Sequence, residues 1–229
     1  MCERLARICA FFGVPMERAQ EAQMTHRREI LTIGHSTLSY EQFLHLLRRA
    51  GVTAVADVRS APYSRHFPHF NRDALREELR QDNIDYRFVG EKLGGRPADK
   101  TFFCEGVADY ERMAMAPAFE QGLELVIEGA KKHRIAIMCS EHDPLDCHRC
   151  LLVSRALAER GILTKHILSN GSIVGHSEIV ERLLRLEGQL GDDLFLSQDE
   201  RLAAAYRKRA RKVAYAERSS DLADRVAAE

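Results

Sequence analysis

The sequence contains no tryptophan, and no apolar run approaches the roughly 18 residues needed to cross a bilayer. It also lacks an excess of charge of either sign, because Lys and Arg total 34 and so do Asp and Glu. This balance excludes an overall charge that would attract nucleic acid or a membrane surface, so only local clusters can indicate such a partner. The remaining composition is ordinary for a globular protein, and no internal repeat is visible.

Signals for export are lacking as well. The segment Met1–Arg7 carries Glu3 and has no long apolar stretch, so it does not resemble a secretory signal. We therefore expect a cytoplasmic protein with no membrane partner. In that setting the cysteines are expected to be free thiols, metal ligands or nucleophiles rather than a disulfide framework. The six are Cys2, Cys9, Cys104, Cys139, Cys147 and Cys150.

Short apolar runs alternate with segments of helical spacing from residue 29 onward. Apolar runs predict strands at residues 30–33, 52–58, 84–89, 135–138 and 165–168. Between them lie helical patterns, one starting after Ser39 as an N-cap and another at Pro117. Strands that alternate with helices of this length indicate βαβ units and a parallel sheet.

The predicted fold class is therefore α/β. We expect a single domain over residues 29–188, with a mostly parallel, Rossmann-like sheet of about five strands and helices on both faces. Residues 1–28 are expected to form an N-terminal helical extension. Residues 189–229, rich in Ala, Arg and Glu, are expected to form a C-terminal helical extension that includes a basic run at 207–212.

Polar residues follow several of these strands at their carboxyl ends. His35 follows the first strand, Asp57, Arg59 and Ser60 close the second, and Cys139 closes the fourth. Parallel sheets place their binding sites outside the carboxyl ends of the strands. We therefore expect these side chains to share one crevice, although a lone histidine in this position is more often structural than catalytic.

The segment from Cys139 to Cys150 is the most distinctive part of the sequence. It joins an apolar strand to a predicted helix, with Asp146 as the cap and Cys147, His148 and Arg149 in the first turn. A helix start favours an anion or a thiolate, and an arginine fork suits phosphate or carboxylate. An activated Cys139 or Cys147 with a histidine base, His142 or His148, is one interpretation.

Two other interpretations of the same segment stay open. Metal binding is the first, since Cys139, His142, Cys147 and His148 are ligands suited to zinc or iron. Simple packing is the second, because cysteines after a strand are often buried small hydrophobic residues.

The loop after the second strand alternates arginines, histidines and aromatic residues. Arg59 and Arg65 could hold phosphates while Tyr63, Phe67 and Phe70 stack on bases, which indicates a nucleic acid or nucleotide-like ligand. The alternative is a surface loop ordered by proline, whose aromatic residues fold back onto the core.

These motifs resemble a bacterial and archaeal family, domain-of-unknown-function family 488, over about residues 30–180. The matching pieces are Thr32–Ser36, Asp57–Ser60, Pro68–Asn71, Leu93–Gly95, Asp109–Tyr110, Cys139–Arg149 and His176. The resemblance implies a compact α/β fold of Rossmann-like layering. It also implies that Cys139, Cys147, His148 and Arg149 are signature residues, whereas Cys150 stands where the family more usually has serine.

We therefore expect an enzyme that acts on an anionic, phosphate-bearing or nucleic-acid-derived substrate. The expected catalytic residues are Cys139, Cys147, His148 and His35. The expected substrate-binding residues are Asp57, Arg59, Ser60, Arg65, Arg149 and Tyr110. The alternatives are a nucleic-acid-binding module without catalysis and a metal-dependent enzyme that uses the same cysteines and histidines.

Overall fold

A computed structural model describes residues 29–191 and 196–217 of the chain. The predicted N-terminal extension, residues 1–28, lies outside the described residues. Within the described ranges, no helix has both the length and the apolar character that crossing a membrane requires.

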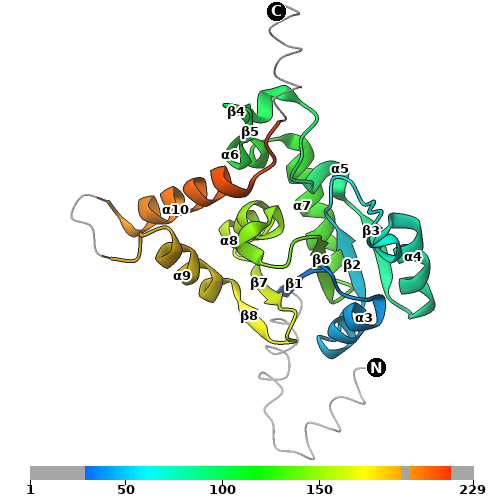
Figure 1. The fold of residues 1–229 in the computed structure, drawn as a ribbon. Coiled ribbons are helices and arrows are strands. Elements are labelled where there is room, and N and C mark those ends of the chain that lie inside the picture. The colour runs from blue at the N-terminus through cyan, green and yellow to red at the C-terminus, as the bar shows by residue number, and fades with distance from the viewer. Residues whose placement is uncertain (1–28, 192–195, 218–229) are drawn as a thin grey trace, which may run out of the picture.

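A six-stranded sheet forms the centre of the fold, in the order β3-β2-β6-β1-β7-β8 (Figure 1). Neighbouring strands run parallel except β8, which is antiparallel to β7. The strands are β1 (Glu29–Gly34), β2 (Ala54–Asp57), β3 (Asp85–Phe88), β6 (Ile135–Cys139), β7 (Leu163–Ile167) and β8 (Ile173–Gly175). The α/β fold class and its mostly parallel sheet are thus confirmed, and β8 adds a short strand to the predicted five.

Helices cover both faces of this sheet. On one face α3 (Tyr40–Arg49) and α4 (Arg72–Gln81) close an apolar core against side chains such as Leu31 and Met138. The core on the other face also takes in buried side chains from six helices. These are α5 (Gly90–Leu93), α6 (Tyr110–Ala114), α7 (Pro117–Ala130), α8 (Arg155–Glu159), α9 (His176–Leu186) and α10 (Gln198–Val213).

Short elements connect these layers. They are the 3-10 turns η1 (Pro68–Phe70), η2 (Lys100–Phe102) and η3 (Pro144–Asp146), the hairpin strands β4 (Phe103–Cys104) and β5 (Val107–Ala108), and the π-helical segment η4 (Arg149–Ser154). The sequence pattern predicts one continuous helix after Cys147, but the structure places η4 before α8. Within η4 the Ser154 hydroxyl donates to the Arg149 carbonyl at 2.8 Å. Such π-helical turns are frequent at functional sites.

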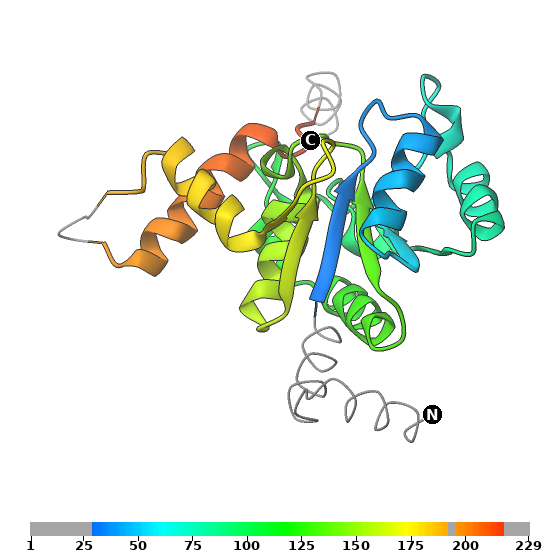
Figure 2. The ribbon, with the colours of Figure 1, turned by 90° about the horizontal axis from the view of Figure 1, so that it is seen from below.

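The C-terminal part of the chain shares the core of the sheet domain. Helix α10 starts with a capping box at Ser197 and buries Ala205 and Tyr206 in the same apolar cluster as β6 and α7. Beyond this helix, the Ala108 amide donates to the Tyr215 carbonyl at 2.9 Å, so the chain runs alongside β5. In Figures 1 and 2, α9 and α10 lie together on the opposite side of the molecule from α3 and α4.

Candidate active site

The loops that follow β1, β2 and β6 meet at the carboxyl end of the sheet. The His35 amide donates to the Cys139 carbonyl at 3.0 Å, and the Val58 amide donates to the Met138 carbonyl at 3.1 Å. A cavity of about 500 Å³ opens where these loops meet. Its lining includes His35, Ser36, Arg59, Ser60, Tyr63, Phe67, Arg96, Tyr110, Cys139, Glu141, Cys147, His148 and Tyr215. The predicted crevice at the strand ends is therefore present.

Two glycines allow the close approaches that shape this cavity. A Cβ atom on Gly34 would lie 1.9 Å from the Glu141 carbonyl oxygen, so a side chain there would separate the β1 and β6 loops. A Cβ atom on Gly95 would lie 2.7 Å from the ring of His148. The loop that contains Gly95 thus packs directly against the histidine beside the thiols.

Two buried thiols and an imidazole form the centre of the site. His148 donates its Nε2 hydrogen to the Val58 carbonyl at 2.9 Å, because a carbonyl oxygen only accepts. The other ring nitrogen, Nδ1, lies 3.7 Å from the Cys139 sulfur and 3.9 Å from the Cys147 sulfur. The carbonyl therefore fixes the ring so that Nδ1 faces both thiols.

The charges of the site favour one thiolate. Burial opposes ionisation of Cys147, but a hydrogen bond from Cys139 and the positive charges of Arg149 and His148 outweigh it, so the pKa of Cys147 is well below its usual value. The hydrogen bond to Cys147, together with burial, raises the pKa of Cys139. Burial lowers the pKa of His148, yet its contacts with Cys147 produce a net rise. The site thus favours a Cys147 thiolate beside a His148 imidazolium.

Arg149 shapes the loop beside these thiols. Its guanidinium donates to the carbonyls of Glu141 and His142 at 2.6 and 3.0 Å, and its backbone amide donates to the Cys147 sulfur at 3.4 Å. The side chain is fully buried and does not line the cavity. Arg149 therefore supplies positive charge to the thiolate while its donors hold the loop.

A buried ion pair forms the neighbouring wall. Asp57 accepts from Arg59 Nε at 3.0 Å and Nη2 at 2.7 Å, and Arg59 Nη2 also donates to the Phe70 carbonyl. Arg59 Nη1 lies 3.3 Å from His35 Nε2, and His35 Nδ1 donates to the Ser36 carbonyl. Burial and the Arg59 charge lower the pKa of His35 to about 4. His35 is therefore a neutral acceptor that orients Arg59.

Tyr110 and Glu141 also face the thiols from the cavity wall. The Tyr110 side chain is buried and lines the cavity. Burial, followed by the charges of Cys147 and Cys139, raises the pKa of Tyr110. Burial and the Cys147 charge also raise the pKa of Glu141. Both shifts favour the protonated forms of these groups beside the thiolate.

Reasoning from the sequence misses Glu141 and Arg96 as site residues. Glu141 follows the strand-end Cys139 by two positions, which is a usable signal. Arg96 follows the glycine pair at 94–95; its guanidinium lies over the Tyr215 ring at 5.2 Å, and its amide donates to Ser60 Oγ at 2.9 Å. Ser60 thus holds the loop that brings a cationic side chain to the rim of the cavity.

Two predicted residues lie away from this centre. Arg65 is exposed and does not line the cavity. The His142 ring contacts Ser169 Oγ at 2.7 Å, outside the thiol group, whereas the Cys139, Cys147 and His148 ligand atoms lie within 4.8 Å of one another. The structure thus brings together three of the four candidate metal ligands.

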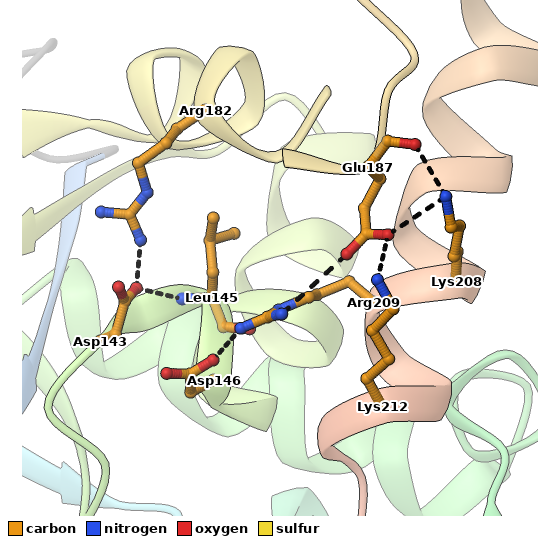
Figure 3. A network of polar contacts seen from close by, with 8 residues as sticks. All are labelled: Asp143, Leu145, Asp146, Arg182, Glu187, Lys208, Arg209 and Lys212. Carbon is orange, nitrogen blue, oxygen red and sulfur yellow. Dashed lines mark hydrogen bonds and ion pairs between the residues drawn. The ribbon is translucent and has the colours of Figure 1, made fainter. Parts of the chain in front are cut away.

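The C-terminal helices hold the loop that precedes Cys147 (Figure 3). Asp143 pairs with Arg182 of α9, and Asp146 pairs with Arg209 of α10. Arg209 Nε also donates to the Leu145 carbonyl at 3.0 Å. Asp146, expected to cap the following helix, is thus used to anchor α10. These contacts attach the loop to both helices and so hold Cys147, the residue that follows the loop.

The basic run at 207–212 is engaged by acidic side chains. The ion pairs are Arg207–Glu111, Lys208–Glu187, Arg209–Asp146, Arg211–Glu105 and Lys212–Glu187. Pairing offsets much of the positive charge that a nucleic acid would otherwise meet. This run therefore gives little support to a nucleic-acid contact through α10.

Comparison with curated proteins and with solved structures gave no match. The model of one family, described as Domain of unknown function DUF488, matches residues 39–156. The match covers more than half of the chain and includes Asp57, Arg59 and the segment from Cys139 to Arg149. The chain therefore belongs to the DUF488 family.

Proposed function

We propose that this protein is an enzyme that uses Cys147 as a nucleophile on an anionic substrate. The observation that carries the proposal is the orientation of His148, whose Nε2 bond to Val58 directs Nδ1 toward the sulfurs. A thiolate is the reactive form of cysteine, and a neighbouring imidazolium stabilises it near neutral pH. Both cysteine and histidine line the cavity, so a bound substrate would reach them.

The cavity also suits a substrate with negative charge and a planar group. Arg59 and Arg96 line it from two loops that touch at the Arg96–Ser60 hydrogen bond, and the charge of Arg149 also acts on the Cys147 thiol. Tyr63 at the rim is 70% exposed, a geometry suited to stacking on a base. A phosphate-bearing or nucleic-acid-derived substrate fits this combination best.

The reaction we propose is a hydrolysis in two steps. The Cys147 sulfur bonds to the electrophilic atom of the substrate while the bond to the leaving group breaks, and that group takes the proton of Glu141. Water then displaces the sulfur and returns a proton to the Glu141 carboxylate. Burial and the Cys147 charge raise the pKa of Glu141, which favours the protonated form that the first transfer uses, and no electron carrier is required.

Labelling with iodoacetamide, resolved by mass spectrometry, tests the nucleophile. We expect Cys147 to react faster than the partly exposed Cys104 near neutral pH. Inorganic phosphate should slow the labelling of Cys147. Arg96→Ala should weaken that protection, whereas Arg87→Ala, which removes an exposed arginine outside the cavity, should leave it unchanged. Faster labelling of Cys104, with no effect of phosphate, would contradict the proposal.

A metal-dependent enzyme is the second candidate. Tetrahedral zinc holds a sulfur and a nitrogen about 3.6 Å apart, close to the observed 3.7 and 3.9 Å. Moreover, a metal-bound histidine normally donates its other N–H, as His148 does to Val58. Cys139, Cys147 and His148 would then hold a metal that activates water, with Glu141 as the proton carrier.

Metal analysis of untagged protein separates the two candidates. A metal-dependent enzyme predicts that Cys147→Ser loses about one metal ion per chain relative to the unaltered protein, whereas Cys104→Ser loses none. A thiolate enzyme predicts that Cys147→Ser leaves the metal content unchanged. It further predicts that chelated protein labels at Cys147 as fast as untreated protein.

A further inference from the structure

A second group of Cys and His side chains lies outside the active-site cavity. Cys150 comes from η4, His166 from β7 and His176 from the start of α9. All three are buried, and their ligand atoms lie within 4.8 Å of one another. None of them lines the cavity that contains Cys147. The reaction proposed for Cys147 makes no use of this group.

We infer that Cys150, His166 and His176 form a separate binding site for a transition metal of the zinc type. Two imidazole nitrogens and one thiolate are ligands that such ions prefer. The site goes beyond the proposed function, and the evidence for it does not depend on the reaction at Cys147.

The facing nitrogens have a separation close to that of two zinc ligands. His166 Nε2 lies 3.0 Å from His176 Nδ1, and two nitrogens on a tetrahedral zinc ion lie about 3.3 Å apart. A shift of a few tenths of an ångström would therefore admit the ion between them. In the metal-free chain a single proton occupies this gap as a hydrogen bond.

The outward-facing nitrogens of both rings are already held by hydroxyl groups. His166 Nδ1 lies 2.8 Å from Thr32 Oγ1, and His176 Nε2 lies 3.0 Å from the Tyr206 hydroxyl. Histidines that bind metals commonly donate their second N–H to such a partner, which fixes the tautomer and the ring orientation. The arrangement around both rings therefore matches that of paired metal ligands.

The electrostatics of the group favour uncharged imidazoles. Burial lowers the pKa of His176 to about 4, and burial together with the His176 charge lowers the pKa of His166. Both rings thus offer lone pairs at neutral pH. Burial raises the pKa of Cys150 to about 12, against the effect of Arg149. A bound cation would supply the charge needed to ionise this thiol.

Metal at this position would connect parts of the chain that are distant in sequence. Its ligands come from η4, β7 and α9, and the hydroxyls behind them come from β1 and α10. Because a ligand that binds only the folded state stabilises it, the metal should raise the melting temperature. The C-terminal helices would then depend on the metal for part of their attachment.

Cobalt binding to a full-length variant with one cysteine tests the site. The variant retains Cys150 and carries Cys2→Ser, Cys9→Ser, Cys104→Ser, Cys139→Ser and Cys147→Ser. We expect it to bind one Co²⁺ per chain, with a thiolate-to-cobalt charge-transfer band and a raised melting temperature. The band can arise only from Cys150, so its absence at saturating Co²⁺ would overturn the inference.

Two further variants complete this test. Adding Cys150→Ser should remove the band, and adding His176→Gln should weaken Co²⁺ binding at least tenfold. Circular dichroism checks that each variant is folded. A band that persists with unchanged affinity in His176→Gln would also overturn the inference, because Cys150 would then bind cobalt without His176.

Discussion

Replacing His148 with glutamine isolates the contribution of the imidazolium charge to Cys147. The amide of Gln can still donate to the Val58 carbonyl, which His148 Nε2 reaches at 2.9 Å, but it carries no charge toward the sulfurs. An opposite charge at this range typically shifts a pKa by about 1 to 3 units. We therefore expect His148→Gln to raise the pKa of Cys147 by that amount.

The effect on reactivity is smaller than the effect on ionisation. Below both pKa values, each unit of increase reduces the thiolate fraction tenfold, while the more basic thiolate is intrinsically more nucleophilic, with a Brønsted coefficient of about 0.4–0.5. The net loss is roughly 3- to 50-fold in the alkylation rate. His148→Asn serves as the matched variant, because its shorter amide can contact the sulfurs but not Val58.

Stopped-flow alkylation with iodoacetamide between pH 4 and 10 measures both effects. We expect the midpoint of the Cys147 profile to move upward in His148→Gln, and the maximal rate at high pH to rise roughly 3- to 30-fold because the thiolate is more basic. An unaltered midpoint, in a variant whose melting temperature matches that of the parent protein, would refute the thiolate–imidazolium assignment.

Three other predictions concern the surroundings of the site. Gly95→Ala should slow the alkylation of Cys147 at least tenfold, because the added Cβ would lie 2.7 Å from the His148 ring. Gly191→Ala is the control and should have no effect, because its Cβ would meet nothing within 4 Å. Equal alkylation rates in the two variants would contradict the packing of Gly95 against His148. Asp57→Asn should lower the free energy of unfolding in urea by about 3–5 kcal/mol, since it leaves Arg59 buried without its partner. The exposed pair partner Asp73 is the control, and Asp73→Asn should cost less than about 1 kcal/mol; a similar loss in both would show that burial is unimportant. Finally, folding lowers the pKa of His35, so the unfolded chain takes up a proton on this histidine at a higher pH than the folded chain does. The free energy of unfolding should therefore fall as the pH drops from 6.5 to 4, with His35 accounting for about 3 kcal/mol at pH 4. Urea unfolding of His35→Gln should show a correspondingly shallower pH dependence, and an identical slope would argue against a buried neutral imidazole.

Much of the fold could be predicted because its signals are local. The run at 135–138 is apolar on both faces and becomes β6, with all five residues buried. Ser39 accepts the Gln42 amide as an N-cap, as its position before a helical pattern indicates. Parallel strands bring the residues after their carboxyl ends to one edge of the sheet, so the meeting of Cys139, Asp57 and His35 could be predicted from topology alone.

The roles within the site depended on contacts that sequence does not specify. Arg149 has the charge of a substrate ligand, yet its donors go to the Glu141 and His142 carbonyls. Asp146 has the position of a helix cap, but its carboxylate accepts from Arg209, which lies 63 residues later in the chain. The π-helical turn after Cys147 likewise leaves no pattern that distinguishes it from an ordinary helix. Such choices are made by tertiary packing, which overrides local preference.

The most direct test of the central claim is a pH titration of thiolate absorbance in the full-length protein, taken as the difference between the unaltered chain and Cys147→Ser. Assignment of the thiolate to Cys147 predicts a difference signal that appears well below pH 8.5, the ordinary value for cysteine. A signal that emerges only at or above that pH would contradict an activated thiolate at this site.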